Sequence, residues 1–346
     1  MKYLLINILF LISFALNAQI GGQATYEFLN LPNSPKVAAL GGKLISQYSN
    51  DLSLTYYNPA LLNSQMQNHL TLNYVNYFLD INYGYVGYMP NSEKFKNYAT
   101  GIHFINYGKF IKADELGNIT GEFGASEYAL NLTWAKNIDS LFSVGVNAKP
   151  IFSILESYWS IGLVTDVGVV YNNTNSLLTV AFLIRNLGMQ LKTYNDLREP
   201  VPFEIQLGLT KKLIHAPFRL NFILHHLEKY DLTYEIPDDT EYLGYSSQNP
   251  DEKNKAEIFA DNFLRHLNAG VEFVPSDNFY FALGYNFQRS KELRLKTKTS
   301  TVGLSWGFGM RIAKFNIGYS RAHYHLAGST NQFSITTNLS ELFVKR

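Results

Sequence analysis

Residues 279–287 alternate between large apolar side chains and small or polar ones almost without interruption. One set is Phe279, Phe281, Leu283, Tyr285 and Phe287, and the other is Tyr280, Ala282, Gly284 and Asn286. Successive side chains of a β-strand point to opposite faces, so this pattern predicts a strand with one oily face and one small or polar face. So long and aromatic a face is typical of a transmembrane β-barrel, which turns it to lipid and keeps a wetter interior.

The segment 301–312 repeats the alternation with a sharper contrast. Its apolar set is Val302, Leu304, Trp306, Phe308, Met310 and Ile312, against Thr301, Gly303, Ser305, Gly307, Gly309 and Arg311. Similar segments of strand length recur along the chain, at about 69–78, 81–90, 98–107, 127–136, 141–152, 158–171, 177–187, 203–212, 217–227, 263–274, 279–288, 299–312, 314–323 and 331–340. We count about fourteen such segments. An even number of strands is expected for a bacterial single-chain barrel.

The connections between these segments differ in length from one end of the predicted barrel to the other. Short turns fall at 136–140, 172–176, 213–217, 275–278 and 313–314, and they alternate with longer connections at 108–126, 188–202, 228–262, 289–298 and 324–330. The connection at 153–157 is short where this rhythm predicts a long one. Outer-membrane barrels have short periplasmic turns and long external loops. The pattern therefore predicts that the long connections face outward and that the C-terminus is periplasmic.

Residues 19–68 do not have the pattern of a barrel strand. They contain Gly21-Gly22, Gly41-Gly42 and Asn58-Pro59-Ala60, with a short apolar run at 37–40. We expect a folded N-terminal segment that either plugs the lumen or lies at the periplasmic mouth. No convincing linker separates it from the strands, so 19–346 is interpreted as a single β-barrel domain.

Composition and the N-terminus narrow the class of protein. Lys2 followed by an apolar stretch, with small residues at Ala15 and Ala18, predicts a signal peptide at 1–18 and export to the outer membrane. Charged residues make up 16% of the chain, aromatic residues 15%, and the formal net charge is +1. A nucleic-acid partner is not expected, because nucleic-acid-binding proteins normally carry a strong basic excess. The chain has no cysteine, which excludes disulfides and thiol chemistry.

Two predicted external connections carry opposite charge. The 35-residue connection 228–262 holds ten acidic residues, whereas 289–298 is mostly basic. Together they could form a docking surface for a partner protein, or equally a solvated rim that contacts lipopolysaccharide. The candidate docking residues are Asp238, Asp239, Glu241, Asp251, Glu252, Arg289, Lys291, Arg294, Lys296 and Lys298. Leu293 and Leu295 alternate with the basic residues, which predicts a strand hairpin projecting beyond the membrane.

No catalytic signature is found in the sequence. His225-His226 and His323-Tyr324-His325 could suggest a metal, but neither pair has a third ligand nearby in the sequence, so no metal or other cofactor is expected. No nucleophile elbow, phosphate-binding glycine loop or zinc-protease helix is present. We therefore do not expect an enzyme.

Several short stretches of the chain together carry a resemblance to a known family. The most specific are Gln19–Gln23, Tyr26–Pro32, Ala-Ala-Leu-Gly-Gly at 38–42 and Asn-Pro-Ala-Leu-Leu at 58–62. Further matches lie at 72–75, 80–85, 114–118, 126–132 and 202–208. In these stretches the chain resembles the PorQ family of type IX secretion proteins of Bacteroidetes. The resemblance implies a fourteen-stranded FadL-like barrel related to PorV, without catalytic residues. It also implies that PorZ is anchored by this barrel in a cell-surface attachment complex with PorU and PorV.

Two other hypotheses remain. A FadL-type transporter of hydrophobic small molecules would fit the barrel class and the plug-like segment, although the lumen-facing positions are small and polar. A secreted soluble β-protein would be released into the medium without detergent.

Overall fold

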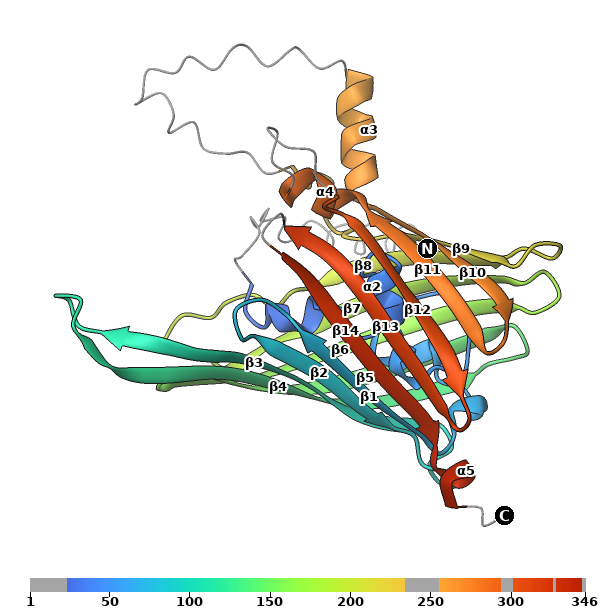
Figure 1. The fold of residues 1–346 in the computed structure, drawn as a ribbon, viewed down its shortest axis with the longest axis horizontal. Coiled ribbons are helices and arrows are strands. Elements are labelled where there is room, and N and C mark those ends of the chain that lie inside the picture. Colours follow the sequence, from blue (N-terminus) through green and yellow to red (C-terminus); the bar gives the residue numbers. More distant parts are fainter. Residues whose placement is uncertain (1–23, 234–254, 294–300, 326–327, 344–346) are drawn as a thin grey trace, which may run out of the picture.

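The computed structural model describes residues 24–233, 255–293, 301–325 and 328–343, and these form a closed barrel of fourteen antiparallel strands (Figure 1). The predicted signal peptide at 1–18 lies outside these ranges. In the described part of the chain, none of the helices combines the length and the apolar character needed to cross a membrane.

The strands follow one another around the barrel in chain order. They are β1 (His69–Asn76), β2 (Asn82–Tyr88), β3 (Tyr98–Ala113), β4 (Ile119–Asn137), β5 (Phe142–Leu155), β6 (Tyr158–Asn173), β7 (Leu178–Lys192), β8 (Glu204–Lys212), β9 (Phe218–Leu224), β10 (Leu267–Ser276), β11 (Phe279–Asn286), β12 (Leu304–Ile312), β13 (Phe315–His325) and β14 (Gly328–Asn338). Pairing of β14 with β1, with Asn338 opposite His69, closes the sheet and removes its edges. Each predicted segment overlaps one strand, and the predicted barrel is confirmed.

The two faces of the strands divide as the alternation predicts. On β11, Ala282 is fully buried and Leu283 is 39% exposed, and on β12 Ser305 is buried and Leu304 exposed. Exposed apolar side chains continue around the barrel wall, among them Leu72, Ile102, Leu130, Phe152, Leu163, Phe182, Leu207, Phe222, Ile317 and Ile335. This outward apolar band is the surface that a transmembrane barrel presents to lipid.

Several predicted boundaries are wrong at one end of the barrel. Most of 108–126 is strand, and β3 and β4 extend away from the wall as a long hairpin (Figure 1). Strands β7, β13 and β14 likewise continue into the connections predicted at 188–202 and 324–330. Beyond the lipid band neither face must be apolar, so the alternation fades while the ladder hydrogen bonds continue. The segment 263–274 begins as a helix and becomes strand only at Leu267.

Residues 24–68, which we call the plug, fill the barrel. Their short helices are η1 (Glu27–Asn30), α2 (Pro35–Ala39), η2 (Leu52–Tyr56), η3 (Pro59–Leu61) and η4 (Ser64–Met66). Helix α2 packs against β11–β14, and η3 packs against β4–β6. Leu29, Leu40, Leu54 and Leu61 are all fully buried. The interior is therefore densely packed where the plug meets the wall, which corrects the expectation of a wetter lumen.

Local sequence explains how the plug turns inside so narrow a space. Helix α2 begins with Pro35 and stops before Gly41 and Gly42, whose φ angles of +92° and +94° reverse the chain in a conformation that glycine adopts without strain. The small wall residues receive this turn: the Ser305 hydroxyl donates to the carbonyl oxygen of Ala39 and accepts from the N–H of Gly41, both at 3.0 Å. The polar face of β12 thus contacts protein.

Candidate functional site at the outer mouth

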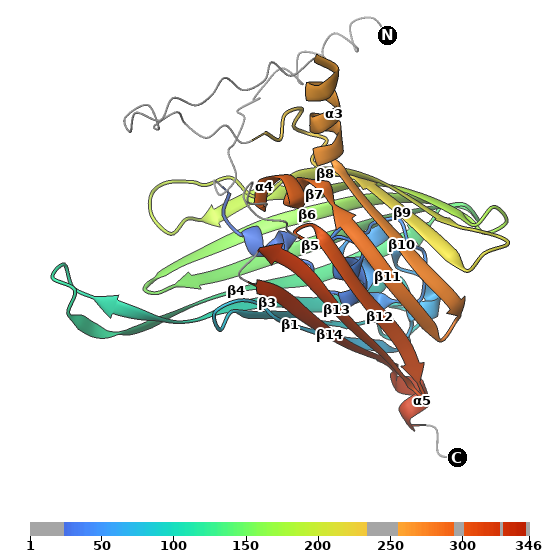
Figure 2. The same ribbon diagram turned by 45° about the horizontal axis from the view of Figure 1, so that its top comes forward.

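One end of the barrel, which we call the outer mouth, carries the larger connections. Helices α3 (Lys255–Arg265) and α4 (Phe287–Leu293) lie above the strands at this end (Figures 1 and 2). The two-residue turns 277–278 and 313–314 and helix α5 (Leu339–Phe343) lie at the opposite end (Figure 1). The larger connections and the tight turns therefore lie at opposite ends of the barrel. Several connections at the outer mouth are short, because the strands that they join are long.

The predicted docking residues fall mostly outside the described ranges. Those outside are Asp238, Asp239, Glu241, Asp251, Glu252, Arg294, Lys296 and Lys298. The remaining two, Arg289 and Lys291, lie on α4, so the predicted strand hairpin is wrong over 287–293. A helix forms because these residues, with the sequence Phe-Gln-Arg-Ser-Lys-Glu-Leu, lie beyond the wall, where no neighbouring strand is needed to satisfy the backbone.

Arg289 and Lys291 have different surroundings. Nη2 of Arg289 donates to the carbonyl oxygen of Gly41 at 3.4 Å, so this side chain contacts the plug. Nζ of Lys291 lies 2.6 Å from Oδ1 of Asp261 on α3, and Arg265 Nε lies 3.2 Å from Oδ2. Burial alone would raise the pKa of Asp261, but the hydrogen bonds from Lys291 and Arg265 outweigh it and lower this pKa. The two oppositely charged connections therefore pair with each other at this point.

Helix α3 presents apolar side chains to solvent. Ile258, Phe259 and Phe263 are 48%, 60% and 48% exposed, and we call these three residues the α3 face. Phe259 and Phe263 are four positions apart, which places them on one side of the helix. Figure 2 shows α3 just before the first residue of β10 and projecting away from the wall. Exposed apolar groups concentrated on a projecting element are typical of contact surfaces.

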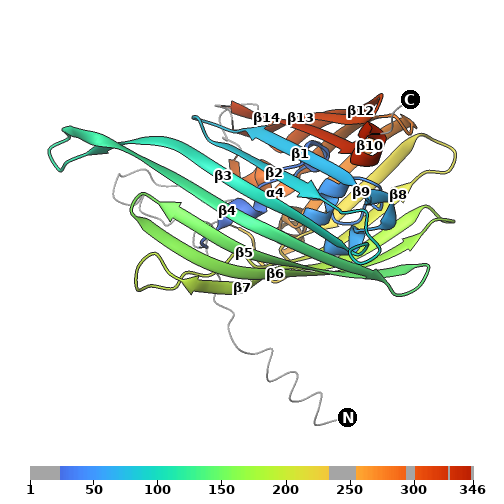
Figure 3. The same cartoon turned by 90° about the horizontal axis from the view of Figure 1, so that it is seen from below.

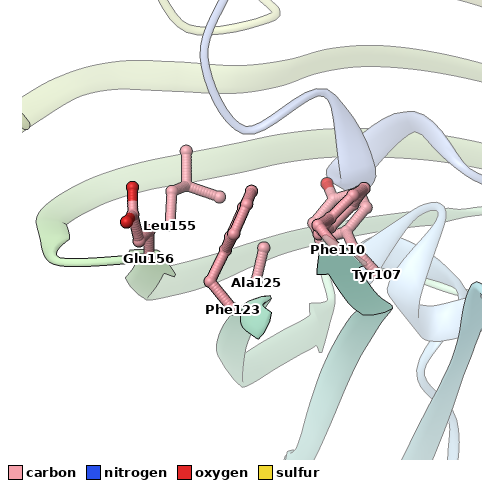
Figure 4. Close-up of a pocket in the computed structure, with 6 residues that line it drawn as sticks. All are labelled: Tyr107, Phe110, Phe123, Ala125, Leu155 and Glu156. Atoms are coloured by element: carbon pink, nitrogen blue, oxygen red, sulfur yellow. The ribbon is translucent and has the colours of Figure 1, made fainter. Parts of the chain in front are cut away.

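A second apolar feature lies at the base of the β3–β4 hairpin. A pocket of about 350 Å³ is lined there by Tyr107, Phe110, Phe123, Ala125, Leu155 and Glu156. Figure 4 shows the rings of Phe110 and Phe123 on the two strands, and they stack with centroids 5.2 Å apart. Leu155 and Glu156 contribute from the β5–β6 hairpin (Figure 4). Apart from Glu156 and the hydroxyl of Tyr107, the side chains that line this pocket are apolar.

Charged side chains in the interior link wall strands to one another and to the plug. Lys149 Nζ lies 2.5 Å from Asp166 Oδ2, with both side chains fully buried. Arg185 Nη2 donates to the carbonyl oxygen of Leu29 at 2.6 Å, and the Tyr56 hydroxyl donates to the same oxygen at 2.8 Å. This network could not be predicted from the sequence, because its members come from three strands and two plug helices. The sequence signal for it is a single charged residue on each of β5 and β6, Lys149 and Asp166, in strands that are otherwise uncharged.

A further polar cluster lies where the plug meets β8 and β9. Lys43 Nζ donates to both Glu204 oxygens at 2.7 Å. His225 and His226, which follow β9, lie beside the same carboxylate. The sequence analysis found no third ligand for this histidine pair, and the structure corrects this by adding Glu204. Pairing of Leu207 with Leu224 brings the ends of the β8–β9 hairpin together, so strand register could have located it.

Solved structures of a transporter and of a channel share this arrangement of strands. The chain is similar to the toluene transporter TodX of P. putida, with 10% identity, 89% of this chain and 99% of that chain covered, and a TM-score of 0.50. It is similar to the CymD monoaromatic hydrocarbon channel, with 13% identity, coverage of 89% and 96%, and a TM-score of 0.50. A Pseudomonas aeruginosa FadL homologue matches at 11% identity, coverage of 88% and 98%, and a TM-score of 0.47.

No family model and no curated protein sequence matches the chain. At these identities the likeness to TodX and CymD concerns the fold alone: a closed fourteen-stranded antiparallel β-barrel.

Proposed function

We propose that this chain is a non-enzymatic outer-membrane protein that holds a surface protein at its outer mouth. The α3 face carries this proposal, because Ile258, Phe259 and Phe263 are exposed on a helix that stands off the barrel. With the resemblance to the PorQ family, the partner is PorZ, in a type IX attachment complex that also contains PorU and PorV. Lipid and lipopolysaccharide surround the apolar wall.

The packing of the lumen supports anchoring. The plug is held by buried charges and by hydrogen bonds from several strands, including those to the carbonyl oxygen of Leu29. A transport path along the axis would require these contacts to separate, whereas an anchor requires a rigid base. The pair of Lys291 and Asp261 then joins α4 to α3, while Arg265 pairs with the same carboxylate within α3.

The test is retention of PorZ on cells that carry variants of the α3 face. A Phe259→Ser, Phe263→Ser double variant should release PorZ into the medium while the amount of barrel in the outer membrane stays unchanged. Leu116→Ser is the matched control, because Leu116 is 88% exposed at the tip of the β3–β4 hairpin and lies outside the α3 face. Undiminished surface PorZ in the double variant would overturn the role of α3.

A second candidate function is passage of hydrophobic small molecules. It is favoured by the apolar pocket at Phe110 and Phe123 and by the shared fold of TodX, a toluene transporter, and CymD, a monoaromatic hydrocarbon channel. Uptake of a radiolabelled monoaromatic hydrocarbon tests it. If the chain transports, Phe123→Ser should lower uptake and the α3 double variant should not. An anchor gives equal uptake with and without the protein.

A further inference from the structure

Three side chains of the kind that ligate metals converge beside the plug at the outer mouth. Glu204 begins β8, and His225 and His226 directly follow β9. One ligand atom from each lies within 4.8 Å of the others. The Oε1 atom of Glu204 is 3.9 Å from Nδ1 of His225 and 3.8 Å from Nε2 of His226. This grouping rests on the barrel wall and is independent of the proposed partner.

The second histidine is held in place by a carboxylate of its own. Oε1 of Glu228 lies 2.9 Å from Nδ1 of His226, which leaves Nε2 directed toward Glu204. The other oxygen of Glu228 accepts a hydrogen bond from the N–H of Ile205 at 2.8 Å. A carboxylate that orients a histidine in this way is the usual outer partner of a metal ligand. His226 also adopts a left-handed φ of 54°, an uncommon conformation for a residue with a side chain.

His225 supplies an independent observation. Its side chain is fully buried, and neither ring nitrogen has a hydrogen-bond partner among the described residues. A buried polar group without a partner costs roughly 1–3 kcal/mol, so such groups are rare in native structures and call for an explanation. A metal ion between the imidazole and Glu204 would satisfy one of these nitrogens with a strong bond.

We propose that Glu204, His225 and His226 bind a divalent transition-metal ion, with zinc as the metal that this ligand set fits best. Two histidines and one glutamate are an established zinc ligand combination, completed by water. Bonds of about 2.0–2.2 Å place tetrahedral ligand atoms about 3.4 Å apart. The two distances from Glu204 to the histidines, 3.9 and 3.8 Å, must therefore shorten by roughly 0.5 Å. The two histidine nitrogens, which lie within 4.8 Å of each other, must also approach to this spacing. His226 is 23% exposed at its side chain, which gives the ion and its water access from the outer mouth.

Lys43 is the competitor of this metal. Its ammonium donates to both oxygens of Glu204, the oxygens that the ion would require. Two cations cannot share one carboxylate in this space without strong repulsion, so metal binding must release Lys43. Lys43 directly follows the Gly41-Gly42 turn of the plug, and its own carbonyl oxygen accepts a hydrogen bond from Asn268 at 3.1 Å. The metal would thus replace a contact between plug and wall.

Zinc binding to the full chain, purified in detergent without a histidine tag, tests the proposal by titration calorimetry. We expect one Zn²⁺ per chain, with Glu204→Gln and His226→Ala each weakening affinity at least ~10-fold and Glu228→Gln weakening it about 10–100-fold. Lys43→Met should strengthen affinity ~10-fold or more, because it removes the competing cation. Damage to the fold would lower zinc affinity, so an increase in affinity cannot be a result of misfolding. His215→Ala is the control, since His215 is exposed in the turn between β8 and β9.

Cobalt provides a second measurement on the same samples. Co²⁺ bound in the wild-type site should give the intense visible absorption of a four-coordinate ion, and this band should vanish in His226→Ala. Retention of the barrel strand signal in circular dichroism verifies that each variant is folded. Zinc affinity that is unchanged in Glu204→Gln and His226→Ala, or lost in His215→Ala alone, would overturn the assignment. Failure of the PorZ retention test would leave it unaffected.

Discussion

Gly284 in the barrel wall lies so close to Leu40 in the plug that a Cβ on Gly284 would come within 2.2 Å of the Leu40 carbonyl carbon. The contacting atom belongs to the backbone, so the neighbour cannot move aside by changing a rotamer. The absence of a side chain at Gly284 is therefore what allows the turn after α2 to rest against β11. Figure 3 shows the plug segments lying within the ring of strands.

Gly284→Ala tests this contact. The added methyl group must displace the plug or the strand, and overpacking of this kind typically costs about 1–3 kcal/mol. Thermal unfolding of the detergent-solubilised protein should show a lower transition temperature. Gly124→Ala is the control, because the nearest atom to a Cβ at Gly124 is 3.7 Å away. Equal transition temperatures for the two variants would contradict the close contact.

The buried pair of Lys149 and Asp166 predicts that removing one partner lowers the free energy of unfolding more than removing both. Asp166→Asn keeps an acceptor for the N–H of Asn186, which bonds to Oδ1 of Asp166 at 2.8 Å, but leaves the Lys149 charge unpaired. Loss of one partner of a buried pair costs about 3–5 kcal/mol. Adding Lys149→Met should recover a large part of this loss in urea unfolding experiments. A double variant no more stable than Asp166→Asn would argue against the pair.

If the apolar wall faces lipid, a charge introduced there should lower stability much more than the same charge at an exposed hairpin tip. Leu283→Arg places a cation on the outward face of β11, midway along the strand, where an arginine in a membrane barrel costs about 2–4 kcal/mol. Refolding into lipid vesicles should show this loss in stability. Leu116→Arg, at the exposed hairpin tip, should change stability by less than about 0.5 kcal/mol. Equal effects at both positions would mean that β11 does not face lipid.

The pairing of α3 with α4 should depend on pH. The pKa of Asp261 is lowered in the folded protein, so the contact is fully formed above the ordinary carboxyl pKa and weakens as pH falls through the folded value. Spin labels at Glu257 and Glu292 should give a narrow distance distribution at pH 7 and a progressively broader one as the pH is lowered below the ordinary carboxyl pKa and then through the folded value. Asp261→Asn should give the broad distribution already at pH 7. A narrow distribution in that variant would exclude the ion pairs as the tether.

The strands could be predicted from the sequence because their signal is local. On β11, the alternation from Phe279 to Asn286 specifies the lipid face without reference to any other segment. The ends of β3 and β4 could not be predicted in this way, because outside the lipid band the alternation disappears while the pairing continues. Their length depends on the partner strand, which hydropathy does not reveal.

The interior could not be predicted because its contacts join residues distant in sequence. Arg185 and Leu29 are 156 positions apart, and nothing near either residue indicates the other. The small and polar side chains on β12 predict a wet lumen. In the structure, Ser305 instead forms hydrogen bonds with the plug. Glu204 could not be assigned as a third ligand from sequence spacing, because only the register of the β8–β9 hairpin places it beside His225.

The proposed anchoring function is tested most directly by identifying what copurifies with the chain after gentle detergent extraction from its native membrane. The account predicts PorZ in near-stoichiometric amount with the wild-type barrel, and its loss from the Phe259→Ser, Phe263→Ser variant. Recovery of the barrel without any surface protein, under conditions that keep the outer membrane assemblies intact, would contradict the account.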